Sequence, residues 1–161
     1  MTQTAQPLVG RDDEVQALAR LLDATRDGSC RFAAVSGEPG IGKSSLLAAL
    51  AARAQGSGAL VLSGRATELE RELPFGLVVD ALDAHLAALD PHAFNRLAAE
   101  EVGELASVFP ALRSLRPSAA PVPASSAERF RAHHAVRELI ERLAAPAPLV
   151  LLLDDLHWSD G

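Results

Sequence analysis

The chain has 161 residues, of which 48% are hydrophobic, 22% charged and 4% aromatic, and its formal net charge is −6. These values are typical of a globular domain rich in helix, and the acidic balance gives no support for direct contact with DNA or RNA. A lone cysteine excludes a disulfide framework, and no apolar run is long enough to span a membrane, so we expect a cytoplasmic protein.

The first segment, Leu8 to Arg11, is a short apolar turn that leads into the acidic run Asp12 to Glu14. Acidic residues favour a helix start because they complement the positive end of the helix dipole. The helix is expected to stop at Gly28. Its apolar residues recur at helical spacing and are Val15, Leu18, Leu21 and Leu22. From the residues alone, the turn at Val9 to Arg11 is a helix entry.

A glycine-rich loop stands between an apolar run and a helical one. Phe32 to Ser36 predicts a buried strand, with Cys30 as a small buried thiol beside it, and Ser45 to Arg53 is rich in helix formers. Residues 37–44 fit the P-loop spacing G-x-x-x-x-G-K-[ST]. The candidate binding residues of this loop are Gly37, Glu38, Pro39, Gly40, Ile41, Gly42, Lys43, Ser44 and Ser45.

The chemistry of a polyphosphate explains the spacing of this loop. Glycines let backbone N–H groups approach phosphate oxygens, and the first N–H groups of the following helix have no partner within it. Lys43 is the only lysine among 15 basic residues, and it would place a compact charge on the β- and γ-phosphates. The Ser44 hydroxyl would bind Mg²⁺. The loop therefore predicts a nucleotide site.

The middle of the chain predicts one strand followed by helices. The strand is expected at residues 59–64 and the first helix at about residues 74–89. The apolar face of that helix consists of Phe75, Val79, Leu82, Leu86 and Leu89. Asp90 is the expected N-cap of the next helix, with Pro91 as its first residue. We expect this next helix to carry an apolar stripe over residues 94–108.

A proline-rich loop at residues 116–124 precedes a further helix. Ser125 and Glu128 have the spacing of a capping box. The apolar face of the helix consists of Val136, Leu139, Ile140 and Leu143. On its outer side Glu138 and Arg142 are expected to pair, because they lie four positions apart.

The last predicted strand ends in two carboxylates. Leu149 to Leu153 is apolar at every position, which predicts a central parallel strand buried on both faces. Asp154 and Asp155 follow at the carboxyl end, where open α/β sheets bind their ligands. Beside a P-loop, Asp154 would orient the Mg²⁺ shell and Asp155 would polarise the attacking water. Taken alone, the pair could instead cap a helix after a buried strand.

Four segments together resemble a known family. They are residues 8–14 (Leu-Val-Gly-Arg-Asp-Asp-Glu), 37–45, 72–76 (Glu-Leu-Pro-Phe-Gly) and 151–158 (Leu-Leu-Leu-Asp-Asp-Leu-His-Trp). In this order they are similar to the N-terminal part of the AAA-type ATPase domain of large ATP-binding LuxR-family regulators, a group of the STAND NTPases. The P-loop is generic, whereas the opening and closing segments are more specific.

The resemblance implies an α/β P-loop NTPase with a mostly parallel sheet flanked by helices. It implies that residues 1–161 are the N-terminal portion of this domain and end after the Walker B strand. A further strand and a helical lid would follow in the family. We therefore expect this segment alone to bind nucleotide weakly and to hydrolyse it poorly.

The resemblance also implies roles for individual residues. ATP and Mg²⁺ would be the ligands, with Lys43 and Asp155 as catalytic residues and Ser44 and Asp154 as metal ligands. The residues placed against the adenine and ribose would be Val9, Gly10 and Arg11. The pair that would lie near the γ-phosphate is His157 and Trp158.

The expected function is an ATP-binding switch module of a larger signalling or transcriptional regulator. DNA would be contacted only through another domain, and the full-length protein could form a homo-oligomer. The alternative is an AAA-type ATPase machine that is not linked to transcription. The Asp-Asp pair disfavours a small-molecule kinase, and a GTPase is disfavoured because the sequence has no Asn-Lys-x-Asp segment.

Overall fold

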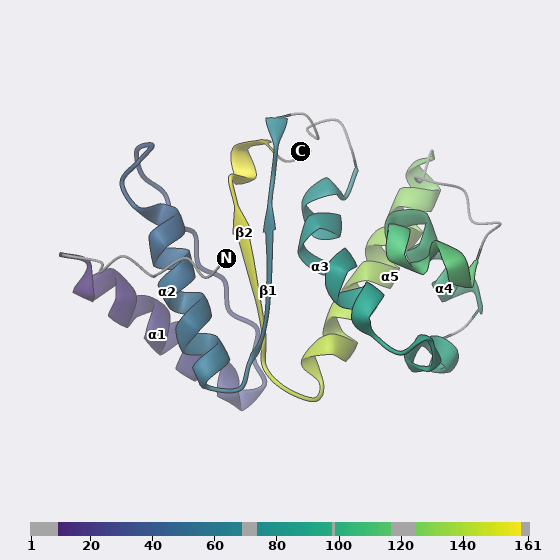
Figure 1. The fold of residues 1–161 in the computed structure, drawn as a ribbon, viewed down its shortest axis with the longest axis horizontal. Coiled ribbons are helices and arrows are strands. Elements are labelled where there is room, and N and C mark those ends of the chain that lie inside the picture. The colour runs from purple at the N-terminus through teal and green to yellow at the C-terminus, as the bar shows by residue number, and fades with distance from the viewer. Residues whose placement is uncertain (1–9, 69–73, 98, 117–124, 159–161) are drawn as a thin grey trace. The chain divides into compact units, whose positions relative to one another are not determined.

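The computed structural model describes residues 10–68, 74–97, 99–116 and 125–158 (Figure 1). The α-helices are α1 (Asp12–Ala24), α2 (Lys43–Gly56), α3 (Gly76–Ala88), α4 (Ala99–Val108) and α5 (Ser126–Ala144). The strands are β1 (Leu60–Arg65) and β2 (Leu149–Asp154). The 3₁₀-helices are η1 (Thr25–Asp27), η3 (Pro91–Arg96), η4 (Pro110–Leu115) and η5 (Leu156–Trp158).

The chain forms two compact units. The first unit comprises Met1–Val61 and Pro146–Leu152, and the second comprises Leu62–Ala145 and Leu153–Gly161. Both strands cross the boundary, so each unit contains part of β1 and part of β2.

The two strands pair in a parallel sheet. In the first unit the Leu60 N–H donates to the Pro148 carbonyl at 2.9 Å, and in the second the Ala66 N–H donates to the Asp154 carbonyl at 3.1 Å. Residue numbers rise together along both strands, which is the pattern of a parallel pair. Of the three predicted strands, the second and the last are therefore confirmed, and helices combined with parallel strands give an α/β fold.

The burial predicted for the last strand is wrong. Of the residues of β2 only Leu152 is buried, and the others are partly exposed. A strand is covered on both faces only when helices pack on each side of it. The apolar sequence of β2 shows that burial of both faces would be favourable, but burial also requires helices that pack on each face.

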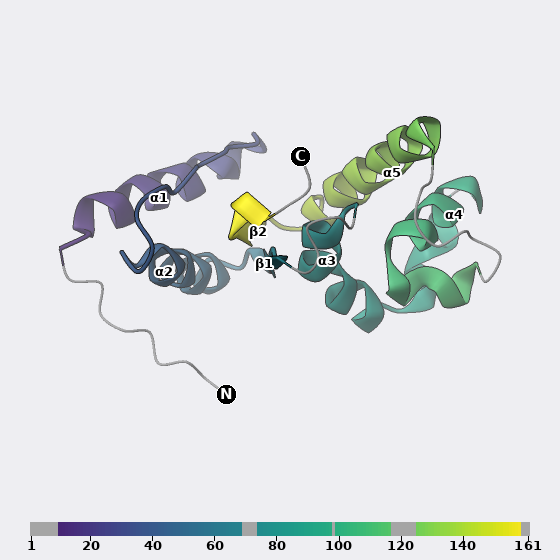
Figure 2. The same cartoon turned by 90° about the horizontal axis from the view of Figure 1, so that it is seen from above.

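In the first unit α1 and α2 lie side by side (Figures 1 and 2). The predicted first helix is confirmed, with three acidic residues in its first turn and Gly28 at a φ of 82° after η1. The buried residues of this pair of helices are Leu18, Ala19, Leu22, Leu46 and Ala54.

The strand predicted at Phe32 to Ser36 is not formed. These residues are irregular, the Phe32 side chain is 92% exposed, and Cys30 is exposed instead of buried. A strand needs a hydrogen-bonded neighbour, and β1 and β2 pair only with each other among the described residues. An apolar run without a partner strand stays irregular, whatever its β propensity.

In the second unit α4 packs on α5, and η4 packs on α3 and α4. The predicted apolar face of α3 is confirmed at its centre, since Leu82 and Leu86 are buried. A Cβ atom added to Gly64 of β1 would lie 2.6 Å from the Leu77 carbonyl oxygen and 2.9 Å from the Ala81 Cβ. The α3 backbone thus approaches β1 so closely that only glycine fits there.

The helix predicted after Asp90 is divided. The Asp90 carboxylate accepts the His92 N–H at 2.8 Å, so the predicted cap is confirmed, but it opens the short 3₁₀-helix η3. Leu97 then takes an extended conformation with ψ of 146°, and α4 is a separate helix. Helical spacing in the sequence continues through residues 94–108 because each of the two helices buries apolar residues, Phe94 in η3 and Leu105 and Val108 in α4.

The capping box of α5 is confirmed, since Ser125 and Glu128 each accept the other's backbone N–H. The predicted pair of Glu138 and Arg142 is not formed as a hydrogen bond. Arg142 instead donates from both terminal nitrogens to Glu101 of α4, which raises the pKa of its guanidinium. Glu138 lies 3.5 Å from His134. A bidentate bond between helices is stronger than a single pair along one helix.

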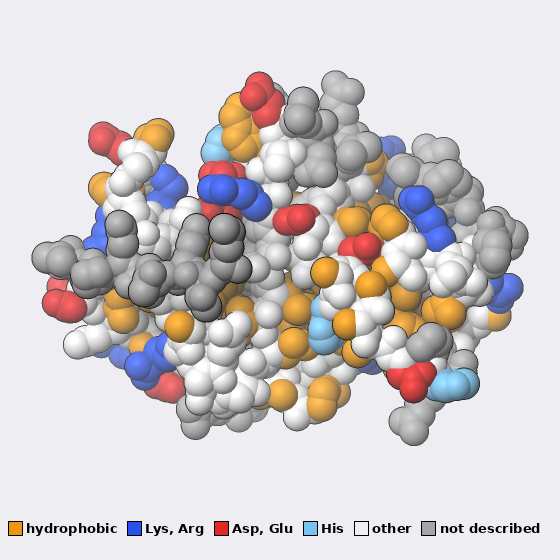
Figure 3. All heavy atoms as spheres, viewed as in Figure 1, with side chains coloured by type: hydrophobic (Ala, Val, Ile, Leu, Met, Phe, Trp, Pro, Cys, Tyr) orange, Lys and Arg blue, Asp and Glu red, His pale blue; other side chains and the backbone are white. Residues whose placement is uncertain are grey.

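Charged side chains of both signs are interspersed on the face shown in Figure 3. None of the helices in the described ranges is both long and apolar enough to cross a bilayer.

The loop predicted at residues 116–124 lies outside the described residues, apart from Arg116.

Candidate functional site

The P-loop belongs to the first unit and leads directly into α2. Gly40 and Gly42 have φ angles of 79° and 94°, which are in the left-handed region that side chains disfavour. A Cβ atom added to either would meet nothing within 4 Å. The loop therefore needs glycine for its backbone conformation, and the space beside these residues is open to a ligand.

The N-terminus of α2 has the features of an anion site. Gly42 is its N-cap, and the first helical hydrogen bond runs from the Leu46 N–H to the Gly42 carbonyl at 3.0 Å. The backbone N–H groups of residues 43–45 therefore lie in the first turn of α2, before the first hydrogen bond of the helix. The first turn of α2 contains no acidic residue, whereas the first turn of α1 contains three. An anionic ligand at α2 would thus meet no competing carboxylate from its own first turn.

Lys43 crosses the loop from the start of α2. Its Nζ donates to the Gly37 carbonyl at 2.9 Å and to the Glu38 carbonyl at 3.0 Å. The loop thus wraps around the ammonium group, which is held where the loop begins. An ammonium has three donors, and two of them point at these carbonyls.

Arg11 also contacts the P-loop. Its Nη2 donates to the Ile41 carbonyl at 2.6 Å, and its Nη1 lies 3.9 Å from a Glu14 carboxylate oxygen. Arg11 is the N-cap residue of α1, so the predicted helix entry is confirmed. Of the other residues predicted to contact the base, Gly10 is described with a φ of 76°, and Val9 lies outside the described residues.

The acidic pair lies in the second unit, where β2 ends. The Asp155 N–H donates to the Asp154 carboxylate at 2.9 Å, and Asp155 itself has a φ of 55°. Aspartate tolerates this left-handed conformation better than most residues do. Asp154 is thus the last residue of β2 and Asp155 begins a sharp turn, as expected for residues at the carboxyl end of the strand.

Arg65 binds both carboxylates, and none of the sequence motifs indicated this role. Its Nε donates to an Asp155 carboxylate oxygen at 2.9 Å, and its Nη2 lies 3.8 Å from Asp154. Its backbone N–H donates to the Asp80 carboxylate of α3 at 2.7 Å. Arg65 is the last residue of β1, and the ends of neighbouring parallel strands meet at one edge. That rule, applied to the two predicted strands, could have found it.

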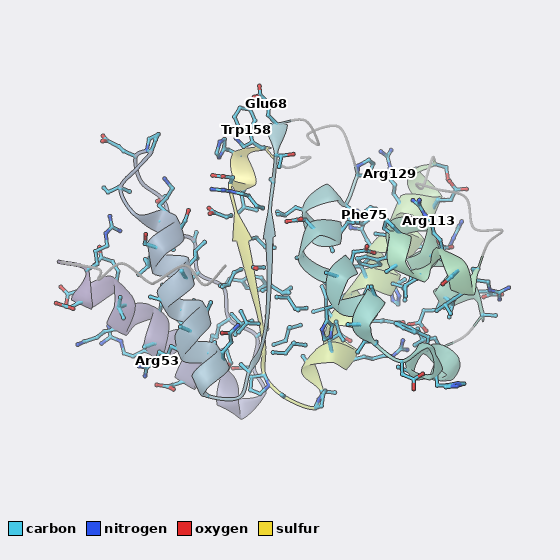
Figure 4. All side chains as sticks on the ribbon, in the orientation of Figure 1. Arg53, Glu68, Phe75, Arg113, Arg129 and Trp158 are labelled. Atoms are coloured by element: carbon cyan, nitrogen blue, oxygen red, sulfur yellow. The ribbon has the colours of Figure 1, made fainter. Side chains whose placement is uncertain are left out.

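The residues after the acidic pair form η5. The Trp158 N–H donates to the Asp155 carbonyl at 2.9 Å, and the His157 and Trp158 rings lie 4.8 Å apart at 45°. Figure 4 shows Trp158 and Glu68 at the end of the sheet where β1 and β2 both terminate. The two rings therefore contact each other beside the acidic pair.

A profile of the AAA ATPase domain family matches residues 7–161. The chain belongs to this family. Comparison with curated proteins gave no match, and comparison with solved structures gave none either. The matched range includes both the P-loop and the acidic pair.

Membership of the AAA ATPase domain family implies nucleotide binding, typically with Mg²⁺. The donor types fit such a metal, because Ser44 offers a hydroxyl and Asp154 a carboxylate, both oxygen ligands. Among the described residues no group of three or more His, Cys, Asp or Glu side chains could hold a metal ion. Ser44 belongs to the first unit and Asp154 to the second, so their joint role stays a prediction.

Proposed function

We propose that this AAA ATPase domain binds ATP through the P-loop and hydrolyses it with Mg²⁺. The observation that carries the proposal is the loop closed around Lys43, whose Nζ is bonded to the Gly37 and Glu38 carbonyls. This closure holds a cation beside the open N-terminus of a 14-residue helix. A cation and oriented amides on one short loop are what a polyphosphate requires.

Each proposed residue has one task. Backbone N–H groups of residues 37–45 would bind the phosphate oxygens, and Lys43 would turn from the loop carbonyls to the β- and γ-phosphates. Ser44 and Asp154 would hold Mg²⁺, which supplies charge neutralisation on the phosphates. Asp155 would orient and polarise the attacking water.

The two units would then form one P-loop ATPase domain over residues 1–161. Support comes from the family match, which spans residues 7–161 and so includes residues of both units. Further support comes from β1 and β2, each of which contributes residues to both units.

We further propose that the domain is the ATP-dependent switch of a larger STAND-type regulator of the LuxR family. Support for this finer assignment comes from the Leu-Val-Gly-Arg opening at residues 8–11 and the Asp-Asp-Leu-His-Trp segment at residues 154–158. The test is the encoding gene. A helix-turn-helix segment in the same reading frame supports a transcriptional output, and a reading frame that encodes only a ring-forming ATPase contradicts it.

Nucleotide binding is tested with a fluorescent ATP analogue and three variants. Lys43→Ala should weaken binding at least tenfold, because it removes a charge-assisted contact to phosphate. Asp155→Asn should leave the dissociation constant within twofold and reduce kcat about 100-fold, as expected for loss of a general base. The control is Arg53→Ala, also in α2, whose guanidinium lies 3.9 Å from Asp23 (Figure 4).

The control variant should bind ATP as the parent does. Equal affinity of the parent and Lys43→Ala would contradict the P-loop assignment. Equal loss of binding in Lys43→Ala and Arg53→Ala would show a general effect on α2, and would also contradict it. Unchanged kcat in Asp155→Asn would remove the proposed role of the acidic pair.

A further inference from the structure

Arg11 ties the start of α1 to the P-loop. Its backbone carbonyl accepts the Val15 N–H at 3.0 Å, so the residue is fixed at the beginning of the helix. Its side chain is only 19% exposed, and its Nη2 donates to the Ile41 carbonyl at 2.6 Å. The backbone of Arg11 is thus fixed by the first turn of α1, and its guanidinium is bound to the P-loop.

The bond to the Ile41 carbonyl fixes the orientation of a peptide plane. In a trans peptide the carbonyl and the following N–H point in opposite directions, so the Gly42 N–H points away from the Arg11 guanidinium. Gly42 has a φ of 94° and lacks a side chain, so nothing on its own Cα prevents this peptide from turning over. A charge-assisted hydrogen bond to the carbonyl is a direct way to prevent it.

We infer that Arg11 is a positioning residue of the nucleotide site. It holds the peptide between Ile41 and Gly42 so that the Gly42 N–H is directed at a phosphate of the bound nucleotide. This role differs from contact with the adenine and ribose, which the family resemblance implies for Arg11. The inference rests on the proposed function for the identity of the ligand. The orientation of the peptide between Ile41 and Gly42 can nevertheless be measured when no ligand is bound.

The first test uses the nucleotide-free chain. The variants are Arg11→Gln, which loses the charge, and Arg11→Lys, which keeps it. The control is Arg53→Gln, because Arg53 also links α2 to α1, through Asp23 at 3.9 Å. In a ¹H–¹⁵N spectrum the Gly42 signal should shift or broaden in Arg11→Gln, recover in part in Arg11→Lys and stay unchanged in Arg53→Gln. An unchanged Gly42 signal in folded Arg11→Gln would overturn the inference.

The second test separates positioning from contact with the base. ATP and inorganic tripolyphosphate share the phosphates, but only ATP carries adenine. If Arg11 positions the loop, Arg11→Gln should weaken the binding of both ligands by the same factor, about tenfold. Loss of affinity for ATP alone would assign Arg11 to the base and overturn the inference.

The outcomes distinguish this inference from the proposed function. If the parent chain binds neither ligand, the proposed function fails, while the Gly42 signal still decides whether Arg11 holds the peptide. If Arg11→Gln does not fold, the Arg11→Lys variant decides. A lysine has one point charge in place of a planar fork, so an intermediate Gly42 shift and an intermediate affinity are expected. If folded Arg11→Lys has the same Gly42 signal and the same affinity as the parent chain, the inference is overturned.

Discussion

The Arg65 Nε donates a hydrogen bond to Asp155 at 2.9 Å, which links the end of β1 to the residue that follows β2. The Arg65 side chain is 63% exposed and that of Asp155 is 31% exposed. Water and salt therefore compete with this ion pair, and its main effect is to orient the Asp155 carboxylate.

A double-mutant cycle on this pair should give a small coupling energy. We expect about 0.5 kcal/mol between Arg65→Ala and Asp155→Ala, because exposed ion pairs typically contribute less than about 1 kcal/mol. The measurement is urea unfolding followed by the fluorescence of Trp158, the single tryptophan, which lies in the same unit. A coupling above about 2 kcal/mol would show that the pair is a main support of the unit.

Two glycine-to-alanine changes in the second unit should have opposite effects on stability. Gly64→Ala would place Cβ 2.6 Å from the Leu77 carbonyl oxygen, a backbone atom that cannot move freely, so we expect a loss of about 1–3 kcal/mol. Gly103→Ala lies in α4 with nothing within 4 Å, and alanine favours a helix over glycine by up to about 1 kcal/mol. Unfolding midpoints in urea that move in the same direction would contradict this packing.

The core of the second unit can be tested with two phenylalanines. Phe109 is fully buried and follows α4, so Phe109→Ala should reduce the free energy of unfolding by about 3–5 kcal/mol. Phe130 of α5 is 73% exposed, and Phe130→Ala should change it by less than about 0.5 kcal/mol. Thermal melting of both variants provides the comparison. Equal destabilisation would mean that the two side chains are not buried as described.

A pH effect is expected at the end of η1. Hydrogen bonds from the Ser29 hydroxyl and backbone N–H lower the pKa of Asp27 from its ordinary value of 3.8. Because this pKa is lower in the folded chain, its contribution to stability is present above pH 3.8 and is lost as pH falls through the folded value. NMR titration should show the Asp27 pKa rising in Ser29→Ala, and an unchanged value would assign the shift to another group.

The sequence predicted those elements whose signals are local. The acidic turn of Asp12 to Glu14 starts α1, and Ser125 and Glu128 cap α5, both as expected. Asp90 is a helix cap as expected, although the helix that it caps is the short η3. Each of these features depends on hydrogen bonds or charges within a few residues, so the adjacent residues in the sequence are enough to predict it.

The sequence could not predict what depends on distant partners. The run from Phe32 to Ser36 has strand propensity but forms no strand, because pairing needs a neighbour that its own residues do not specify. Arg142 was expected to bind Glu138 and binds Glu101 of α4 instead. For the site, the P-loop pattern located Lys43, while the bonds made by Arg11 and Arg65 appear only once the chain is folded.

We propose that one bound nucleotide has its metal beside both Ser44 and Asp154. The most direct measurement is a ¹H–¹⁵N spectrum of the chain with ATP and paramagnetic Mn²⁺ in place of Mg²⁺. We predict that the signals of Ser44 and Asp154 both broaden in the parent chain and that neither broadens in Lys43→Ala. Broadening of only one of the two signals, or equal broadening in the parent and in Lys43→Ala, would contradict a shared site.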